Sequence, residues 1–475
     1  MTESTPNVLA ENLATSALHA FCQIPNMPTA VRITLLRGLA QSLLSTIDSL
    51  VTLADTETHL GTVRLTGEVK RTCFQLEAFA DYIQEGKHQR RLQEPANEAL
   101  QPAWRPALEL TTVPLGPVAV FAASNFPFAF SVLGGDTASA LAAGCPVIVK
   151  AHPAHLALSR EIARLAQQVL ADLSLPAAWI SLLDSPGIEA GAQLVMQPGI
   201  AAVGFTGSLQ AGKALAGLIA KRAQPIPFFG ELGSVNPVLV MPEFLSQQPA
   251  TSAHALADAM VQSAGQFCTS PGLLIIEASP AGDAFVEALA SRLDSHITHP
   301  MLTTGMQASF DKQLAKIRGV PEVRMKTVTS VLPDTAVTSP TPTLLEVSLE
   351  FFIANPDLKE EVFGPYAVVV RTPKSLAGYL AALTQIQGSL TLTFWADDKD
   401  AEMVKTLLPL AMARAGRVLF GGVPTGVAIS EAQHHGGPWP ASTRPDTTSV
   451  GMRAIERFLR PVVLQNKPNW LDTQE

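Results

Sequence analysis

The sequence has few charged residues for its size. Only 16% of its 475 residues are Asp, Glu, Lys or Arg, against roughly 25% in an average soluble protein. Hydrophobic residues make up 47%, which is an ordinary share. Disordered chains have the opposite balance, low hydrophobicity with high charge, so disorder is excluded. At roughly 150 residues per domain, we expect two or three domains with a large buried volume.

Positive charge is scarcer than negative charge. The 33 Lys and Arg residues stand against 41 Asp and Glu residues, giving a formal net charge of −8. A nucleic-acid partner, which would need a broad basic face, is therefore not expected. The most apolar stretch, 113–133, is interrupted by Pro114, Pro117, Asn125 and Pro127. Because a spanning helix needs about 20 uninterrupted apolar residues, we predict no membrane partner.

Cysteine is also rare. The four cysteines, at positions 22, 73, 145 and 268, are too few and too scattered for a disulfide framework or a zinc site. They suit a reducing compartment, in which one thiol can be kept for chemistry. The opening MTESTPNVLAENL has neither the basic region nor the apolar segment of a secretory signal. We expect a cytoplasmic protein without a metal.

The first half of the chain shows an alternation of strands and helices. Residues 29–85 have helical apolar spacing. Apolar strands then alternate with helices over 118–241, the strands being VAVFAAS, PVIVKAH, ISLLDS, IAAVGFTGS and IPFFGEL. This alternation indicates a parallel, doubly wound α/β sheet. Such sheets bind ligands beyond the carboxyl ends of their strands.

A second alternation begins near residue 252 and predicts a second α/β domain. Helices are expected at 252–264 and 281–293, with a strand at 272–278 between them. The segments LEVSLEFFIA, AVVVRT, LTLTFWA and GRVLFGG are predicted to be strands. The tail AIERFLRPVVLQN (454–466) combines a short helix with an apolar strand, and an exposed strand of this kind usually needs a partner.

Three side chains are candidates for catalysis. Cys268, in GQFCTSPG, is predicted on an exposed loop and can serve as a nucleophile if its thiolate is stabilised. Glu231 ends an apolar strand, where partial burial raises the pKa of a carboxylate toward that of a general base. Asn125 ends another strand, and its amide can donate to an oxyanion. Taken singly, an inert thiol, a capping carboxylate and a turn asparagine remain alternatives.

A glycine-containing turn, GFTGSLQAG (204–212), joins a predicted strand to a predicted helix. Ser208 can cap that helix, and the backbone amides there can face a phosphate. The turn lacks the G-x-G-x-x-G spacing of a dinucleotide fingerprint, so by itself it is weak support for cofactor binding.

Taken together, these motifs resemble the aldehyde dehydrogenase superfamily. The order is that of the family: N-F-P at 125–127, the lysine at the strand end, G-F-T-G-S, E-L-G, the loop cysteine 37 residues later, and EEVFGP at 360–365. The segments LGTVRLTGEVKRTCFQLEAFAD, KAHPAHLALS, GQFCTSPG, FGGVPTGVAIS and HHGGPWPASTRPDTTSVGMRAIERFLRPVVLQN resemble the α-ketoglutaric semialdehyde (2,5-dioxovalerate) dehydrogenase branch. That branch oxidises 2,5-dioxopentanoate to 2-oxoglutarate with NADP⁺ or NAD⁺. NADP-preferring fatty-aldehyde dehydrogenases share part of this signature and are the alternative.

The resemblance implies a mechanism. The Cys268 thiolate attacks the aldehyde carbon, and the amide of Asn125 with the Cys268 backbone N–H holds the oxyanion of the thiohemiacetal. Hydride transfer to the nicotinamide leaves a thioester, which Glu231 hydrolyses by activating water. An acylating relative that passes the thioester to coenzyme A generally lacks the E-L-G base, and a non-catalytic relative tends to lose the base or the cysteine. Both are present here.

The resemblance also assigns cofactor residues. Lys150 and Glu361 hold the riboses, Phe363 packs beside the nicotinamide, Ser208 contacts the pyrophosphate, and Gly207 lets the backbone approach. Relatives that prefer NAD carry a glutamate three residues after the lysine, and Pro153 stands there instead. This favours NADP with NAD possible, although SPGIEAG offers no arginine for a 2′-phosphate. Relatives usually carry Asn at the position of Gly421, whose presence here is expected to loosen the substrate mouth.

Helical spacing suggests how the far end of the substrate is recognised. Arg64, Arg71 and Gln75 fall at i, i+7 and i+11, on one face of a helix. The family's helix end places Arg71 at the wall of the substrate tunnel. We expect Arg71, with Arg64 or Gln75, to bind the carboxylate or keto group. The alternative is a solvated helix face with Arg71 paired to Glu68.

The expected architecture is an aldehyde dehydrogenase-like α/β fold with three parts. A Rossmann-type cofactor domain comprises 1–85 and 112–230, and an α/β catalytic domain comprises 231–425. A β oligomerisation arm and the C-terminal segment comprise 86–111 and 426–475. The family's arm implies a homodimer or homotetramer, between which the sequence does not distinguish.

Overall fold

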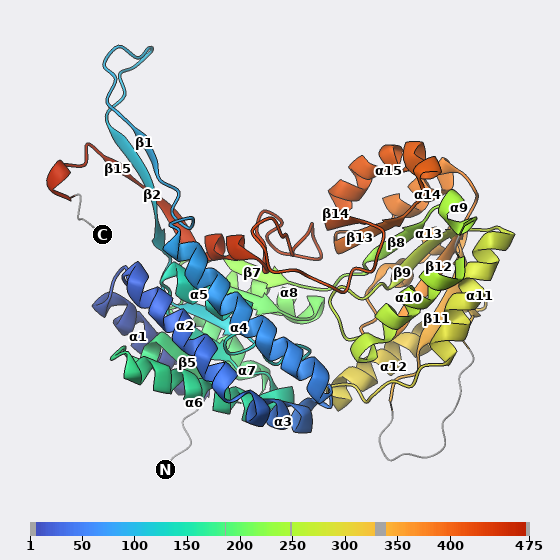
Figure 1. Cartoon of the computed structure of the whole chain (residues 1–475), viewed down its shortest axis with the longest axis horizontal. Coiled ribbons are helices and arrows are strands. Elements are labelled where there is room, and N and C mark those ends of the chain that lie inside the picture. Colours follow the sequence, from blue (N-terminus) through green and yellow to red (C-terminus); the bar gives the residue numbers. More distant parts are fainter. Residues whose placement is uncertain (1–5, 186, 248, 328–338, 472–475) are drawn as a thin grey trace.

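The computed structural model describes residues 6–185, 187–247, 249–327 and 339–471 (Figure 1). Two α/β lobes stand side by side, and a narrow arm of strands projects from the first. The first lobe is built on a five-stranded sheet of order β5-β4-β3-β6-β7. The second has a seven-stranded sheet of order β10-β11-β12-β9-β8-β13-β14, parallel except at β10. Each lobe has the α/β architecture predicted from the alternation.

The sheet of the first lobe is buried on both faces. Its strands are β3 (Val118–Phe121), β4 (Val147–Lys150), β5 (Ile180–Leu183), β6 (Ala202–Thr206) and β7 (Phe228–Glu231). One face packs on α2 (Thr29–Ser45), α4 (Thr62–Gln84), α5 (Gly135–Ala143) and α6 (Leu156–Asp172), with α3 (Ile47–Thr58) beside them. The other face packs on α1 (Pro6–Gln23), α7 (Ile188–Met196) and α8 (Leu209–Ile219). Strands covered on both faces need continuous apolar sequence, as observed.

The second lobe repeats this layering. Its strands are β8 (Pro237–Val240), β9 (Leu273–Glu277), β10 (Arg324–Met325), β11 (Thr343–Ser348), β12 (Tyr366–Thr372), β13 (Ser389–Trp395) and β14 (Ala415–Phe420). One face carries α9 (Pro242–Leu245), α10 (Pro249–Val261) and α11 (Pro280–Asp294). The opposite face carries α12 (Thr304–Arg318), α13 (Leu349–Ala354), α14 (Leu376–Thr384) and α15 (Ala401–Arg414).

Two sequence predictions in this lobe are wrong in part. LEVSLEFFIA is not one strand, because β11 ends at Ser348, whose hydroxyl accepts a hydrogen bond from the backbone N–H of Phe351 and caps α13. The helix predicted to reach residue 264 ends at Val261 and continues as a 3₁₀ turn over Gln262–Gly265. The second difference reshapes the approach to the candidate nucleophile.

The arm joins distant parts of the chain. Strand β15 (Leu459–Gln465) pairs antiparallel with the whole of β2 (Leu108–Pro114), and β1 (Leu92–Glu94) pairs with the other edge of β2. Before β15, residues 441–443 lie against the end of β7, where Ala441 O accepts from Leu232 N. The C-terminal segment therefore belongs partly to the first lobe. No helix in the described ranges is long and apolar enough to cross a membrane.

Candidate active site

Cys268 lies between the lobes at the end of a tightly wound loop. The loop passes through Ser263 and Ala264, both with φ of 53°, and Gly265 with φ of 69°. Left-handed backbone is costly for residues with a side chain, and such strain concentrates at functional sites. Cys268 is half-buried, which corrects the prediction of an exposed loop.

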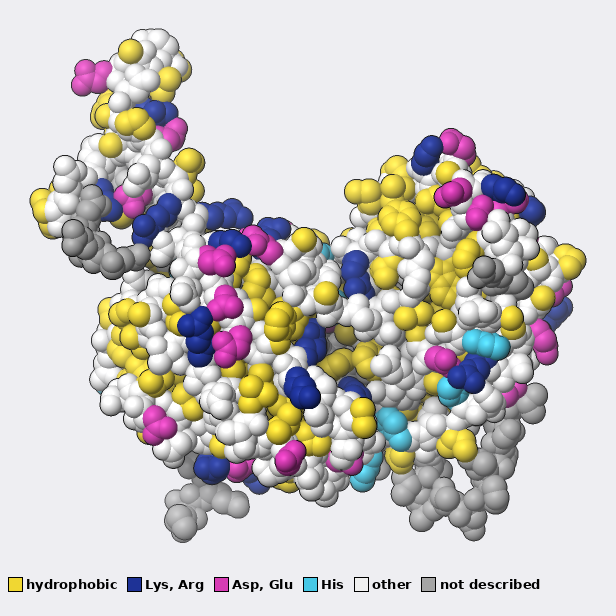
Figure 2. All heavy atoms as spheres, viewed as in Figure 1, with side chains coloured by type: hydrophobic (Ala, Val, Ile, Leu, Met, Phe, Trp, Pro, Cys, Tyr) yellow, Lys and Arg dark blue, Asp and Glu magenta, His cyan; other side chains and the backbone are white. Residues whose placement is uncertain are grey.

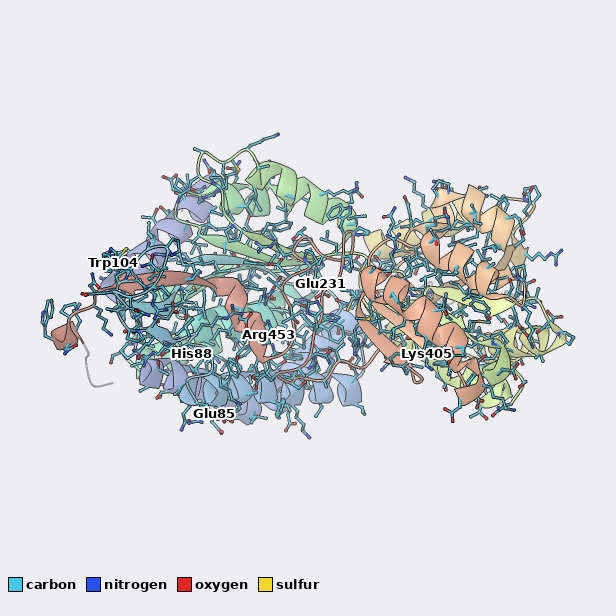
Figure 3. The ribbon with its side chains drawn as sticks, turned by 90° about the horizontal axis from the view of Figure 1, so that it is seen from above. Glu85, His88, Trp104, Glu231, Lys405 and Arg453 are labelled. Carbon is cyan, nitrogen blue, oxygen red and sulfur yellow. The ribbon has the colours of Figure 1, made fainter. Side chains whose placement is uncertain are left out.

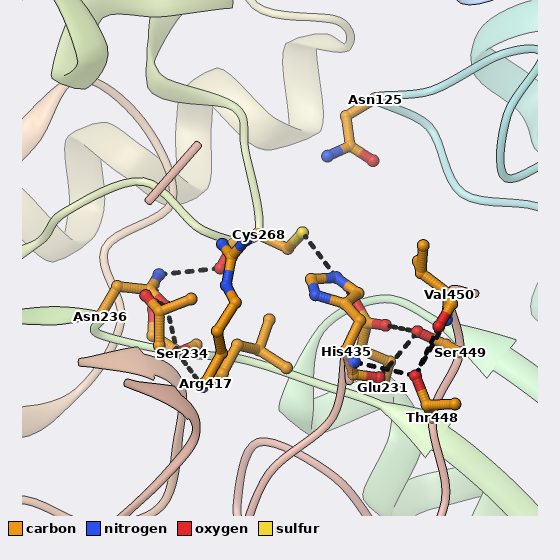
Figure 4. Close-up of polar contacts among 12 residues, drawn as sticks. Asn125, Glu231, Ser234, Asn236, Cys268, Arg417, His435, Thr448, Ser449 and Val450 are labelled. Atoms are coloured by element: carbon orange, nitrogen blue, oxygen red, sulfur yellow. Dashed lines mark hydrogen bonds and ion pairs between the residues drawn. The ribbon is translucent and has the colours of Figure 1, made fainter. Parts of the chain in front are cut away.

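Asn236 fixes this loop through hydrogen bonds of its side chain. Its side-chain amide donates to the carbonyl oxygens of Cys268 at 2.8 Å and Ser270 at 2.9 Å. Its Oδ1 accepts from the hydroxyls of Ser234 at 2.7 Å and Thr391 at 3.0 Å. Asn236 is itself buried, with φ of 45°. Figure 4 shows it beneath the cysteine, so the backbone of the nucleophile is fixed by a fully used amide.

The cysteine loop also packs directly on the EEVFGP segment. A Cβ atom added to Gly265 would lie 2.2 Å from the carbonyl carbon of Gly364, so the two backbones are in contact and only glycine fits there. This contact explains why a glycine precedes the cysteine by three residues. It places Glu361 and Phe363, on that segment, close to Cys268.

A histidine that the sequence analysis did not single out lies between the nucleophile and the acid. His435 Nε2 is 3.6 Å from Cys268 Sγ and 3.1 Å from Glu231 Oε1 (Figure 4). The other carboxylate oxygen accepts a short hydrogen bond from the Ser449 hydroxyl. His435 and Glu231 are both buried. Figure 3 shows Glu231 at the junction of the two lobes.

The pKa of Glu231 shifts in the opposite direction from the prediction. Burial alone would raise the pKa of Glu231, but the electrostatic interaction with His435 and the Ser449 hydrogen bond outweigh burial and lower it. The predicted upward shift is therefore wrong. Burial, together with the carboxylates of Glu231 and Glu361, instead raises the pKa of the Cys268 thiol well above its ordinary value. Without ligands, the thiol form is favoured over the thiolate.

Asn125 faces the nucleophile from the first lobe. Its side-chain amide donates to Gln266 O at 2.9 Å, two residues before Cys268, and Figure 4 shows it across from the thiol. The backbone carbonyl of Asn125 accepts from the Arg64 guanidinium at 2.5 Å.

The three residues predicted to bind substrate have different surroundings in the structure. Arg64 lies over the rings of Phe126 and Phe267, with its guanidinium carbon 5.1 and 5.3 Å from the ring centroids. It therefore joins the N-F-P turn to the residue preceding Cys268. Gln75 is buried beside Gly135, where an added Cβ would lie 2.7 Å from its amide nitrogen. These placements favour positioning and packing roles for Arg64 and Gln75.

Arg71 is half-buried and lies within electrostatic reach of both Cys268 and Glu68. Glu68 is buried and accepts hydrogen bonds from the backbone N–H groups of Phe128 and Ala129. This helix face is thus covered and not solvated. A second arginine, Arg417 on β14, adjoins Cys268 and was not found from the sequence (Figure 4). It donates to the carbonyls of Pro424 and Gly426, which fixes the loop after β14.

The first group of cofactor candidates lies at one edge of the first sheet. Lys150 ends β4, is buried, and donates only to the adjacent Ala151 O. Burial lowers its pKa. Ser208 caps α8 by accepting from Ala211 N, while a Cβ on Gly207 would come within 2.7 Å of the Phe205 ring. The Lys150 ammonium, with donor capacity left for a ligand, and the N-terminus of α8 both lie at the carboxyl edge of a parallel sheet. This arrangement fits a dinucleotide.

The second group faces it from the other lobe. Glu361 and Phe363 line a small pocket together with Ser234, Phe267 and Gly265. Burial raises the pKa of Glu361 to about 8. A protonated or hydrogen-bonded carboxyl in such a cavity suits contact with neutral hydroxyls, as the ribose role requires. The residues present therefore fit a nicotinamide cofactor, which Lys150 and Glu361 would approach from opposite lobes.

Comparison with known proteins identifies the family. The model of the aldehyde dehydrogenase family matches residues 4–437. The chain belongs to the aldehyde dehydrogenase family. The family and the enzyme class predicted from the motif order are thereby confirmed. The fold of this aldehyde dehydrogenase also matches the NADP-complexed glyceraldehyde-3-phosphate dehydrogenase of Methanocaldococcus jannaschii, with a TM-score of 0.80, 18% identity, and 97% and 95% of the two chains covered.

Two curated relatives are more similar in sequence. The α-ketoglutaric semialdehyde dehydrogenase 2 of Azospirillum brasilense is 41% identical over 95% of this chain and 86% of its own length. The α-ketoglutaric semialdehyde dehydrogenase of Acinetobacter baylyi is 39% identical over 96% and 86%. Proline utilization A of Bradyrhizobium japonicum shares the fold, with a TM-score of 0.80, 21% identity, and 98% of this chain but 45% of that chain covered. The similarity to the α-ketoglutaric semialdehyde branch is confirmed.

Proposed function

We propose that this aldehyde dehydrogenase oxidises 2,5-dioxopentanoate to 2-oxoglutarate. The observation that carries the proposal is the meeting of Cys268, Glu231 and Asn125 between the lobes, with Arg71 within electrostatic reach of Cys268. The names of the two curated relatives supply the substrate class. A substrate with an aldehyde at one end and an anion at the other matches a thiol faced by a guanidinium.

We propose a residue for each chemical step. His435 Nε2 is placed to take the thiol proton, after which Cys268 Sγ bonds to the aldehyde carbon and the carbonyl oxygen becomes an oxyanion. The Asn125 amide and the Cys268 backbone N–H stabilise that oxyanion. When NAD(P)⁺ is bound, its nicotinamide accepts the hydride that leaves the carbon. Glu231 then takes a proton from the water that attacks the thioester, releasing the acid and the thiol.

The choice of cofactor is proposed as NADP, with NAD also accepted. Pro153, the residue that replaces the usual glutamate, starts a short 3₁₀ turn and presents no charge to a 2′-phosphate. Lys150 lies nearby, and Asp184, an acidic group that interacts with it, is paired with Arg160 at 2.8 Å. A 2′-phosphate would thus meet an ammonium without an unpaired carboxylate.

The arm is proposed to join subunits in a homodimer or homotetramer. Apolar side chains on and beside it are solvent-exposed in the single chain, among them Leu92, Trp104, Val463 and Trp470. Figure 2 shows yellow side chains along the arm, and Figure 3 labels Trp104 where the arm is seen from above. Exposed apolar strands usually have a partner. All four cysteines are unpaired, which suits the cytoplasm.

A substrate panel tests the proposed function. The purified enzyme is assayed with 2,5-dioxopentanoate, with hexanal and with a long-chain aldehyde, each with NADP⁺ and NAD⁺. We expect kcat/KM to be highest for dioxopentanoate with NADP⁺, and 2-oxoglutarate to form in equal amount to the reduced cofactor. A higher kcat/KM for the neutral long-chain aldehyde would contradict the proposed substrate and favour a fatty-aldehyde dehydrogenase.

A further inference from the structure

Three side chains at the centre of the site carry the donor atoms that zinc prefers. Cys268 Sγ, His435 Nε2 and one carboxylate oxygen of Glu231 all lie within 4.8 Å of one another. A thiolate, an imidazole and a carboxylate are each zinc ligands, and three protein ligands with one open position are typical of exchangeable zinc sites. Among the described residues, these are the only three such groups that converge in this way.

The spacing of the donor atoms matches a tetrahedral ion. Zinc bonds of about 2.3 Å to sulfur and about 2.0–2.2 Å to nitrogen and oxygen place tetrahedral ligands about 3.6 Å apart for S and N, and about 3.4 Å apart for N and O. The observed distances are 3.6 Å from Sγ to Nε2 and 3.1 Å from Nε2 to Oε1. A carboxylate oxygen of Glu231 lies within 4.8 Å of Sγ, so the carboxylate has to shift as zinc binds.

An unsatisfied oxygen points to a ligand independently of that spacing. Glu231 is only 4% exposed, and among the described residues its Oε1 has no hydrogen-bond partner, although Nε2 of His435 lies 3.1 Å away. A buried carboxylate oxygen in this state is costly. The other carboxylate oxygen, Oε2, accepts a hydrogen bond from the Ser449 hydroxyl. This bond orients the carboxylate, as hydrogen bonds to metal-binding side chains commonly do.

We propose that Zn²⁺ binds Cys268, His435 and Glu231 in the ligand-free enzyme and inhibits it reversibly. The Zn–S bond forms as the thiol proton leaves to solvent, while Nε2 and Oε1 donate lone pairs and water takes the fourth position. The inference rests on the proposed function, because it matters to turnover only if Cys268 is the nucleophile. Zinc and the aldehyde compete for the same Sγ. The positive charges of Arg71 and Arg417, both within electrostatic reach of Cys268, oppose binding of the cation.

Protection from alkylation tests the site without turnover. The full-length enzyme is treated with iodoacetamide over a range of ZnCl₂ concentrations, and labelling of each cysteine is followed by peptide mass spectrometry. We expect zinc to slow labelling of Cys268 and EDTA to restore it. Cys22, which is exposed on α1, serves as the internal control and should be labelled at the same rate throughout. Equal protection of Cys22 and Cys268, or none of Cys268, would overturn the proposal.

Ligand variants test the composition of the site. His435→Gln and Glu231→Gln should each raise the zinc concentration for half-protection by about tenfold or more, since even outer partners of a metal are worth 10–100-fold. Circular dichroism checks that each variant is folded. As a second measurement, Co²⁺ should give a thiolate charge-transfer band in the wild type that is absent in Cys268→Ala. Unchanged zinc protection in His435→Gln would show that the thiol binds zinc without the proposed site.

The two failures are distinguishable. If zinc protects Cys268 while no aldehyde is oxidised, the proposed function fails and the metal site stands. If dioxopentanoate is oxidised normally but zinc neither protects the thiol nor inhibits, the metal site fails alone. Where both hold, inhibition by zinc should be competitive with the aldehyde.

Discussion

At the scale of single residues, the site depends on what surrounds the thiol more than on the thiol itself. Burial and two carboxylates make Cys268 a weak acid in the ligand-free chain, so its reactivity has to come from His435 and from a bound cofactor or substrate. The three other cysteines have no comparable neighbours. Cys73 and Cys145 are buried, with pKa values raised to about 11 mainly by burial, and Cys22 lies on the surface.

Replacing the nucleophile should abolish oxidation. We expect Cys268→Ala to lower kcat by at least about a thousandfold, because no other group can form the thioester. Reduced cofactor is measured spectrophotometrically with saturating aldehyde. Cys22→Ala, which removes an exposed cysteine from α1, is the control and should keep full activity. Undiminished turnover by Cys268→Ala would remove the assigned nucleophile.

Arg71 should distinguish an anionic aldehyde from a neutral one. Arg71→Ala should lower kcat/KM for dioxopentanoate by about ten- to a hundredfold, the value of a charge-assisted contact of about 1.5–3 kcal/mol, and change the value for hexanal much less. Arg71→Lys keeps the charge and should recover part of the loss. An equal effect on both aldehydes would assign Arg71 to packing.

Pro153 should influence the preference between cofactors. Pro153→Glu restores a carboxylate near the adenosine ribose, so we expect kcat/KM for NADP⁺ to fall about tenfold or more through repulsion of the 2′-phosphate, with NAD⁺ little affected. Pro153→Ala is the uncharged control for loss of the ring. A ratio of NADP⁺ to NAD⁺ that is unchanged in Pro153→Glu would place the 2′-phosphate elsewhere.

Sequence could indicate the candidate residues but not their environment. Cys268, Glu231 and Asn125 stand in recognisable motifs, and they do lie around one site. His435, Asn236 and Arg417 were missed because each acts through a contact with a residue far away in the chain, which no local pattern records. The only local sequence features that could have drawn attention to His435 and Asn236 were the HHGG segment and the N-P of GSVNP. The pKa of Glu231 was predicted in the wrong direction because its decisive neighbours, His435 and Ser449, lie about two hundred residues away.

At the scale of elements, the loop that carries the nucleophile is held on three sides. Asn236 binds its carbonyls, the Gly265 backbone packs on Gly364, and Arg64 lies over Phe267. Each contact comes from a different element: the start of β8, the segment before β12, and α4. The strained backbone at Ser263 and Ala264 persists because these contacts fix it.

Removing the amide of Asn236 should loosen this loop. Asn236→Ala leaves the carbonyls of Cys268 and Ser270 without a donor, so we expect the free energy of unfolding to fall by about 1–3 kcal/mol, and kcat to fall more than KM rises. Urea denaturation and steady-state kinetics measure the two effects. Asn466→Ala on the arm, also at a left-handed position, controls for backbone strain. Equal kinetic effects in the two variants would contradict the role of Asn236.

Apolar periodicity predicted which segments are helices and which are strands, but it did not predict where each helix or strand ends. Periodicity placed the β4, β6 and β9 strands within two residues at most ends. It failed at LEVSLEFFIA, where one serine converts an extended run into a helix by capping it. The turn after α10 was also missed, because its left-handed residues include Ser263 and Ala264, types that rarely adopt that backbone.

At the scale of the whole molecule, the low charge content has identifiable causes. Both large sheets are covered on both faces, which requires apolar strands throughout. The arm adds further apolar side chains at the surface. The overall negative charge, by contrast, gives no information about the substrate, because the proposed contacts with an anionic substrate come from a few arginines near Cys268.

Disrupting the exposed face of the arm should separate subunits. Val463 is 53% exposed on β15, and Val463→Asp would place a charge in the proposed interface. We expect light scattering after size exclusion to shift from a multiple of 50.3 kDa toward that mass. Val63→Asp, at an 89% exposed position on α4, should leave the mass unchanged. A wild type that already elutes as a monomer would contradict the role of the arm.

The site is assembled from segments that are remote in sequence: Asn125 and Glu231 come from the first lobe, Cys268 from the second, and His435 from the segment that returns to the first. Contacts of such long range form late in folding, after each lobe has built its own sheet. Neither lobe alone holds the nucleophile together with its base. A nascent or partly folded chain therefore carries a protein thiol but no catalyst, and reactive aldehyde chemistry begins only once the last segment has docked.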